Sequence, residues 1–151
     1  GCRFHTRCPA VIPGEDWSGS QAAFRRAFTF QTRVKGGDVD VDAVRRQMEN
    51  VDGSAVSDEE VSARIVETIL PGELRSLPND AAEQIREAAR MLVDGDPDGA
   101  DRLLEEVCSS PCADSEPVRM DTGEDRWAAC HRVDPEYDVP AEPIDGTDPS
   151  A

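Results

Sequence analysis

Residues 79–107 read NDAAEQIREAARMLVDGDPDGADRLLEEV. Their first half predicts a helix from Asn79 to about Val93, because apolar residues recur on one face at helical spacing. These residues are Ala81, Ile85, Ala88 and Leu92. Asp96 can then cap a second helix that has Pro97 at its first position. The short connection between the two helices predicts an antiparallel hairpin.

Three more helical patterns precede this hairpin, and each follows a side chain that can cap a helix. The capping residues are Ser18 or Ser20, Asp40, and Ser57, which can form a capping box with Glu60. The first pattern places Phe24, Ala27, Phe28 and Gln31 on one face. We expect this helix to end near Val34, before two glycines. The sequence therefore predicts a mainly α fold, with a small helical bundle or helical hairpins over residues 13–107.

The composition is strongly acidic. The 151 residues carry a formal net charge of −16, with a pI near 4.3, and Lys35 is the only lysine beside 15 arginines. Nucleic acids and anionic lipids are polyanions, so the charge disfavours binding to either. This balance is typical of a halophilic protein, since a Debye length of about 3 Å near 1 M salt screens repulsion between surface carboxylates.

No run of about eighteen apolar residues is present, and the N-terminus lacks the pattern of a signal peptide. We therefore expect a soluble chain without a direct membrane span. Because the chain begins at Gly1 on a cysteine motif, we expect it to be a fragment of a longer protein. Residues 134–151 are acidic and rich in proline, which predicts a disordered tail.

The two ends of the folded region carry cysteines in a split pattern. Residues 1–9 read GCRFHTRCP, residues 112–117 read CADSEP, and residues 128–131 read AACH. Two thiols at each end can converge on one site if the helices between them lead the chain back. Four thiolates suit an iron–sulfur cluster or zinc.

These motifs resemble the C-terminal extension of the ATP-binding subunits of oligopeptide and dipeptide ABC transporters. The opening nine residues differ from the pattern of that extension only by Thr6, which replaces proline. The resemblance covers roughly residues 1–12 and 108–133, which we interpret as the cysteine-rich transporter module and expect to be irregular in structure. Residues 13–107 are then a helical insertion. The resemblance assigns the ligand role to Cys2, Cys8, Cys112 and Cys130, and it leaves Cys108 as a spare thiol.

Three alternatives remain for the group that these cysteines bind. A [4Fe-4S] cluster is favoured, because some members of the resembling family are thought to hold one and because a cluster tolerates loose ligand spacing. Zinc is the second alternative, although its ligands usually stand in tighter pairs. Metal-free thiols are the third, and a disulfide is disfavoured because a transporter ATPase domain faces the reducing cytoplasm.

Four other residues flank the candidate ligands. His5 and His131 are candidates for hydrogen bonds to a cluster sulfur. Phe4 and Trp127 are expected to shield the site from water.

The resemblance implies an accessory C-terminal domain of a peptide importer's ATP-binding subunit, with a structural or regulatory role. Its partners would be the nucleotide-binding domain and other subunits of the parent transporter, at the cytoplasmic face of the cell membrane. The chain has no glycine-rich phosphate loop, so we expect it not to be an enzyme by itself. Two alternatives stay open: a freestanding iron–sulfur redox protein and a metal-free helical interaction module.

Overall fold

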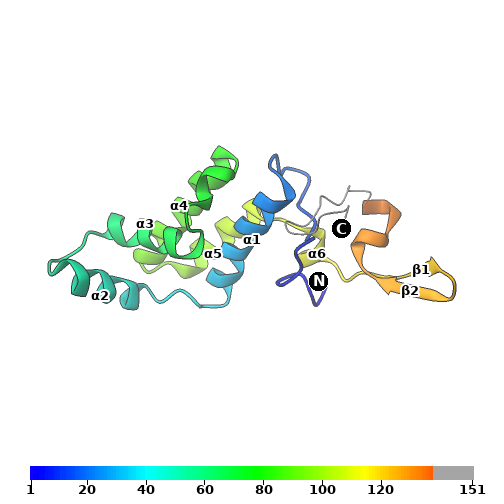
Figure 1. Ribbon diagram of the computed structural model, residues 1–151, viewed down its shortest axis with the longest axis horizontal. Helices are drawn as coiled ribbons and strands as arrows, with labels where there is room; N and C mark the ends of the chain where they lie inside the picture. The colour runs from blue at the N-terminus through cyan, green and yellow to red at the C-terminus, as the bar shows by residue number, and fades with distance from the viewer. Residues whose placement is uncertain (138–151) are drawn as a thin grey trace, which may run out of the picture. The chain divides into compact units, whose positions relative to one another are not determined.

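The computed structural model describes residues 1–137 and is mainly helical, which confirms the predicted fold class (Figure 1). The α-helices are α1 (Gln21–Lys35), α2 (Val41–Asp52), α3 (Asp58–Ile69), α4 (Asn79–Val93), α5 (Pro97–Val107) and α6 (Pro111–Asp114). The other elements are the 3₁₀ turns η1 (Glu73–Ser76), η2 (His131–Val133) and η3 (Pro135–Tyr137), and the strands β1 (Arg119–Gly123) and β2 (Arg126–Ala129).

The chain divides into two compact units. The cysteine unit contains Gly1–Arg25 and the residues from Ser109 onward, and the helical unit contains Arg26–Cys108. The predicted insertion, residues 13–107, therefore begins earlier than the helical unit. One physical reason lies at Gly14, whose amide donates to the carbonyl of Ser109 at 2.8 Å. A side chain at position 14 would overlap Ser109, so glycine permits this close approach.

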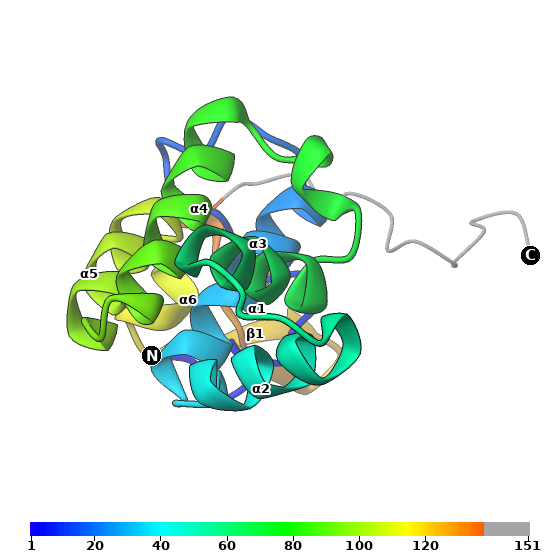
Figure 2. The same cartoon turned by 90° about the vertical axis from the view of Figure 1, so that its left-hand side faces the viewer.

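Helices α4 and α5 pack against each other as the predicted hairpin (Figure 1). Helix α4 has the predicted bounds, and Asp96 caps α5 by accepting the amide of Gly99 at 2.9 Å. Helix α3 packs on α4, as Figure 2 shows. The buried residues of α4 are mostly small: Ala81, Ala82, Ile85, Ala88, Ala89 and Leu92. Small side chains let neighbouring helices approach closely, which explains how a chain with few aromatic residues builds this core.

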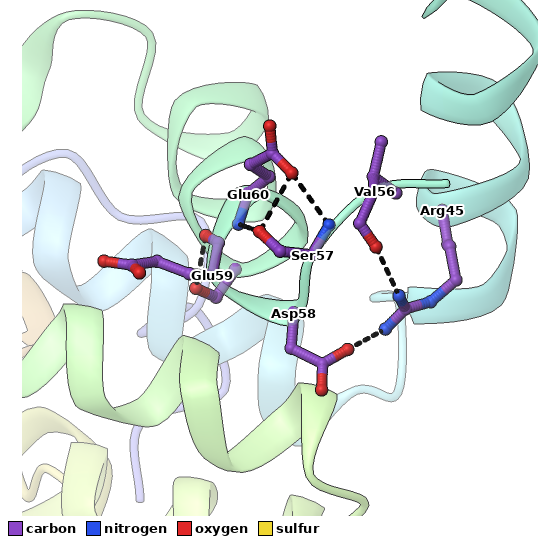
Figure 3. A network of polar contacts seen from close by, with 7 residues as sticks. Arg45, Val56, Ser57, Asp58, Glu59 and Glu60 are labelled. Carbon is purple, nitrogen blue, oxygen red and sulfur yellow. Dashed lines mark hydrogen bonds and ion pairs between the residues drawn. The ribbon is translucent and has the colours of Figure 1, made fainter. Parts of the chain in front are cut away.

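Helix α3 begins at the predicted capping box. The hydroxyl of Ser57 accepts the amide of Glu60 at 3.2 Å, and the carboxylate of Glu60 accepts the amide of Ser57 at 2.7 Å (Figure 3). The next residue, Asp58, accepts from Arg45 of α2 at 2.5 Å, and Arg45 also donates to the carbonyl of Val56 at 3.3 Å. These contacts connect α2, which has no fully buried residue, to the start of α3.

Helix α1 follows the cap at Ser20, whose hydroxyl accepts the amide of Ala23 at 3.1 Å. The predicted core face is buried: Phe24, Ala27, Phe28 and Gln31. The helix ends at Lys35, one residue beyond the prediction. Gly37 follows with a φ of 70°, a conformation that glycine adopts without steric strain.

An antiparallel hairpin, β1 and β2, follows α6, where the sequence analysis predicts irregular structure. Arg119 pairs with Ala129, and Asp121 pairs with Trp127, so Arg119 and Trp127 are diagonal neighbours on one face. The guanidinium of Arg119 lies 4.0 Å from the centre of the Trp127 ring. This cation–π contact stabilises a hairpin whose side chains are mostly exposed.

The predicted disordered tail, residues 134–151, lies mostly outside the described residues. Its first residues form η3, and the ring of Tyr137 packs edge-on against His131 with the ring centres 4.8 Å apart. The prediction of disorder is therefore wrong for residues 134–137, because Tyr137 has an aromatic partner that sequence pattern alone does not reveal. Within residues 1–137, every helix is too short or too polar to cross a membrane.

Candidate functional site

The five cysteines fall into two groups, and all are free thiols. Cys2, Cys8, Cys112 and Cys130 belong to the cysteine unit and are called the thiol site below. Cys108 is the last residue of the helical unit, is 1% exposed and ends α5. Burial raises the pKa of the Cys108 thiol to about 12, so it stays protonated near neutral pH.

The segments that precede and follow the helical unit in sequence meet at Cys2 and Cys112. The amide of Cys2 donates to the carbonyl of Cys112 at 2.7 Å, although the two residues are far apart in sequence. Gly1 lies so close to the backbone of Ala113 that a β-carbon at position 1 would overlap the Ala113 carbonyl. The opening glycine is thus required by the contact between the two segments that carry the first and third candidate ligands.

The sulfur of Cys112 lies in a buried polar arrangement. The amide of Ile12 donates to Cys112 Sγ at 3.5 Å, and the amide of Cys112 donates to the hydroxyl of Ser110 at 3.2 Å. That hydroxyl in turn donates to the carbonyl of Ile12 at 2.6 Å. Together these bonds attach residues 110–112 to residue 12.

Several neighbouring groups shift the pKa of the Cys112 thiol. Burial raises the pKa most, while the hydrogen bonds from Ile12 and Ser110 act in the opposite direction. The thiols of Cys2 and Cys8 raise it further by charge repulsion. A thiolate at Cys112 is therefore disfavoured until a cation or a metal compensates its charge.

Residues 2–8, called the cysteine turn, form a compact loop. The amide of His5 donates to the carbonyl of Cys2 at 3.1 Å, and the amide of Cys8 donates to the carbonyl of Phe4 at 2.8 Å. The imidazole Nδ1 of His5 also lies 2.5 Å from the Cys2 carbonyl oxygen. Through this carbonyl, His5 orients the backbone of a candidate ligand.

The fourth candidate ligand, Cys130, immediately precedes η2. Its carbonyl accepts the amide of Val133 at 3.1 Å. The neighbouring His131 is buried, and its Nε2 lies 3.0 Å from the carbonyl oxygen of Ser115. This contact ties Cys130 to the end of α6 through His131.

The two aromatic residues that are expected to shield the site, Phe4 and Trp127, are largely exposed. Phe4 is 66% exposed and Trp127 is 56% exposed. Trp127 belongs to the hairpin and contacts Arg119, and Phe4 lies on the cysteine turn. Sequence pattern could not tell that these residues belong to surface elements rather than to a core.

Polar residues missed by the sequence analysis hold the cysteine unit together. Arg132 donates to the carbonyl of Ala10 at 2.9 Å and to the amide oxygen of Gln21 at 2.6 Å. Gln21 donates in turn to the carbonyl of Val11 at 2.5 Å. Three segments distant in sequence are thereby joined at the start of α1. In the sequence, the only signal for this hydrogen-bond network is the presence of polar residues near the cysteine motifs.

The helical unit has a groove of about 290 Å³ between α3, η1 and α4. Its lining combines apolar and charged side chains: Glu59, Ser62, Ala63, Val66, Glu67, Leu74, Arg86 and Arg90. Arg90 forms an ion pair with Glu87 at 3.0 Å. The lining contains neither histidine nor cysteine, so this groove offers no soft metal ligands.

Metal-binding geometry is incomplete at the thiol site. Within residues 1–137, no group of three or more His, Cys, Asp and Glu side chains is arranged so that it could hold a metal ion. The donor chemistry of four thiols fits an iron–sulfur cluster or zinc.

Fold and site define a mainly helical domain with a separate cysteine-rich unit. A family model described as a domain of unknown function (DUF8228) matches residues 21–125, and the chain belongs to this family. The match begins at the first residue of α1 and ends in the turn between β1 and β2, so it includes Cys108 and Cys112. No curated protein and no solved structure matches the chain.

Proposed function

We propose that the cysteine unit is an accessory C-terminal module of the ATP-binding subunit of a peptide-importing ABC transporter. Its role there is structural or regulatory, at the cytoplasmic face of the membrane and in contact with the nucleotide-binding domain. ATP hydrolysis belongs to that parent domain, because this chain has no phosphate-binding loop. The support is the resemblance of residues 1–9 and 128–131 to the transporter extension.

We further propose that Cys2, Cys8, Cys112 and Cys130 hold a [4Fe-4S] cluster. The supporting observation is the contact of Cys2 with Cys112, together with the amide of Ile12 that points at Cys112 Sγ. Amide donors to thiolate sulfur stabilise the negative charge of a ligated cluster. When bound, the cluster would supply a cross-link between the two segments that flank the helical unit in sequence, and a site for one electron.

The first test is the metal content of the chain purified without oxygen in high salt. We expect about four iron and about four acid-labile sulfide ions per chain, with a visible absorption band. Cys112→Ala should abolish iron binding. Cys108→Ala is the matched control, because it removes another buried thiol four positions away. Circular dichroism of both variants would establish that they fold.

The possible outcomes separate the alternatives. Zinc without iron would identify a structural metal site. A folded chain that lacks any metal would contradict the cluster and favour a helical interaction module. A reversible absorption change on reduction would favour electron transfer.

The transporter proposal has a separate test. The coding sequence upstream of Gly1 should encode a nucleotide-binding domain with a glycine-rich phosphate loop. An upstream sequence without such a domain would contradict the proposed parent protein, whatever metal the thiols bind.

A further inference from the structure

The cysteine turn has a contact to α1 that the function proposed above does not use. Nη2 of Arg25 donates to the carbonyl of Thr6 at 2.7 Å. Thr6 lies between Cys2 and Cys8, and the amides of His5 and Cys8 are already bonded within the turn. The bond from Arg25 therefore connects the middle of this loop to a regular helix.

The helix that carries Arg25 is itself held in place. Ser20 caps α1, and Gln21 bonds to Val11 and Arg132. The ring of Phe24 packs edge-on against Trp17 with the ring centres 5.1 Å apart. A side chain on such a helix has a more defined position than one on a loop, which suits a residue that must hold a ligand-bearing turn.

The next arginine provides an internal comparison. Arg26 forms an ion pair with Glu73 at 3.2 Å and a hydrogen bond with Ser76 at 3.2 Å, all within the helical unit. Two adjacent arginines on α1 thus serve different units. Of these two arginines, Arg25 is the one that bonds to the cysteine turn.

Charge adds a second argument for Arg25. Burial lowers its pKa, and the nearby thiol of Cys8 acts in the opposite direction. A half-buried guanidinium, such as that of Arg25, is stabilised by hydrogen-bond acceptors and by a negative partner. The Thr6 carbonyl provides one such acceptor on the cysteine turn.

We propose that Arg25 is a positioning residue of the thiol site, which holds the cysteine turn through Thr6 and places a fixed positive charge at that turn. The identity of the bound group rests on the proposed function. Once thiolates ligate a cluster, the site is anionic, and a fixed cation stabilises its more negative, reduced state.

The first experiment needs no cluster. Amide hydrogen exchange is measured by NMR on the full chain with a chelator present, for wild type, Arg25→Gln and Arg26→Gln. Losing a hydrogen bond from a charged donor should speed exchange of the Cys8 amide about tenfold in Arg25→Gln. Arg26→Gln should leave that amide unchanged. Equal exchange at Cys8 in wild type and Arg25→Gln would overturn the proposal.

The second experiment uses the iron-loaded chain. Arg25→Gln should shift the reduction potential to a more negative value, and Arg25→Lys should restore it toward wild type because the charge is kept. A purely structural role would not follow charge in this way, so identical potentials in wild type and Arg25→Gln would overturn the electrostatic part. If wild type binds no iron, the proposed function fails, and the exchange experiment still decides whether Arg25 holds the turn.

Discussion

Glu60 shows how one side chain couples the start of a helix to pH. The amide of Ser57 and its hydroxyl, at 2.7 and 2.9 Å, both donate to the Glu60 carboxylate. These bonds hold the pKa of Glu60 below its usual value, with the backbone bond as the larger cause. Because the folded-state pKa is depressed, the stabilisation is present above the pKa of the unfolded chain and is lost as the pH falls through the folded-state value.

Glu60→Ala should therefore destabilise the chain near pH 7 and have a smaller effect as the solution becomes acidic. Urea unfolding of wild type and variant at about pH 7 and about pH 3 would measure this difference. Glu59→Ala is the control, because it removes an exposed carboxylate from the same first turn. If the loss of unfolding free energy caused by Glu60→Ala were equally large at both pH values, the Glu60 carboxylate would not be the group that stabilises the start of α3.

Among the secondary-structure elements, the β-hairpin carries the most strained backbone. Its turn residues Glu124 and Asp125 have φ values of 51° and 58°, as in a type I′ turn. Glycine adopts this region without strain and asparagine and aspartate adopt it at a modest cost, whereas other side chains such as that of Glu124 disfavour it. The double substitution Glu124→Asn and Asp125→Gly should therefore stabilise the hairpin by about 1 kcal/mol.

Amide exchange of the β1 and β2 residues would detect this stabilisation as slower local opening. Thr122→Asn is a control that changes a nearby exposed residue outside the two turn positions. Unchanged exchange in the double variant would mean that the turn does not limit the stability of the hairpin.

The same contrast between elements explains what sequence could predict. The start of a helix depends on local side chains, so the sequence predicts where α2, α3 and α5 begin. Their N-cap residues are Asp40, Ser57 and Asp96. The sequence does not predict the hairpin, because the pair Glu124 and Asp125 is unusual for its turn type.

The candidate site shows the other limit of sequence pattern. The cysteine motifs indicate which thiols to group, but the bonds from Arg25 to Thr6 and from Ile12 to Cys112 depend on tertiary structure. No local periodicity encodes such contacts. The positioning residues were therefore found only from the three-dimensional arrangement.

In the whole molecule, the cysteine unit is assembled from both sides of the helical unit in sequence. Its closure depends on bonds such as Cys2 to Cys112 and Arg132 to Ala10, which join segments separated by the entire helical unit. Pairing of such distant segments has an entropic cost of loop closure, and the formation of local helices does not have this cost. In the helical unit, by contrast, the most extensive helix contacts join consecutive helices: α2 with α3, α3 with α4, and α4 with α5.

The net charge of −16 opposes this compaction at low salt and leads to the last prediction. The melting temperature should be lower in about 0.05 M potassium chloride than in about 2 M, because salt screens repulsion between carboxylates. High salt also strengthens apolar burial, so a variant with fewer charges separates the two effects. Asp52→Asn, Glu83→Gln and Glu106→Gln together neutralise three exposed carboxylates and should reduce the salt dependence. Equal melting temperatures of wild type at both salt concentrations would contradict adaptation of this surface to high salt.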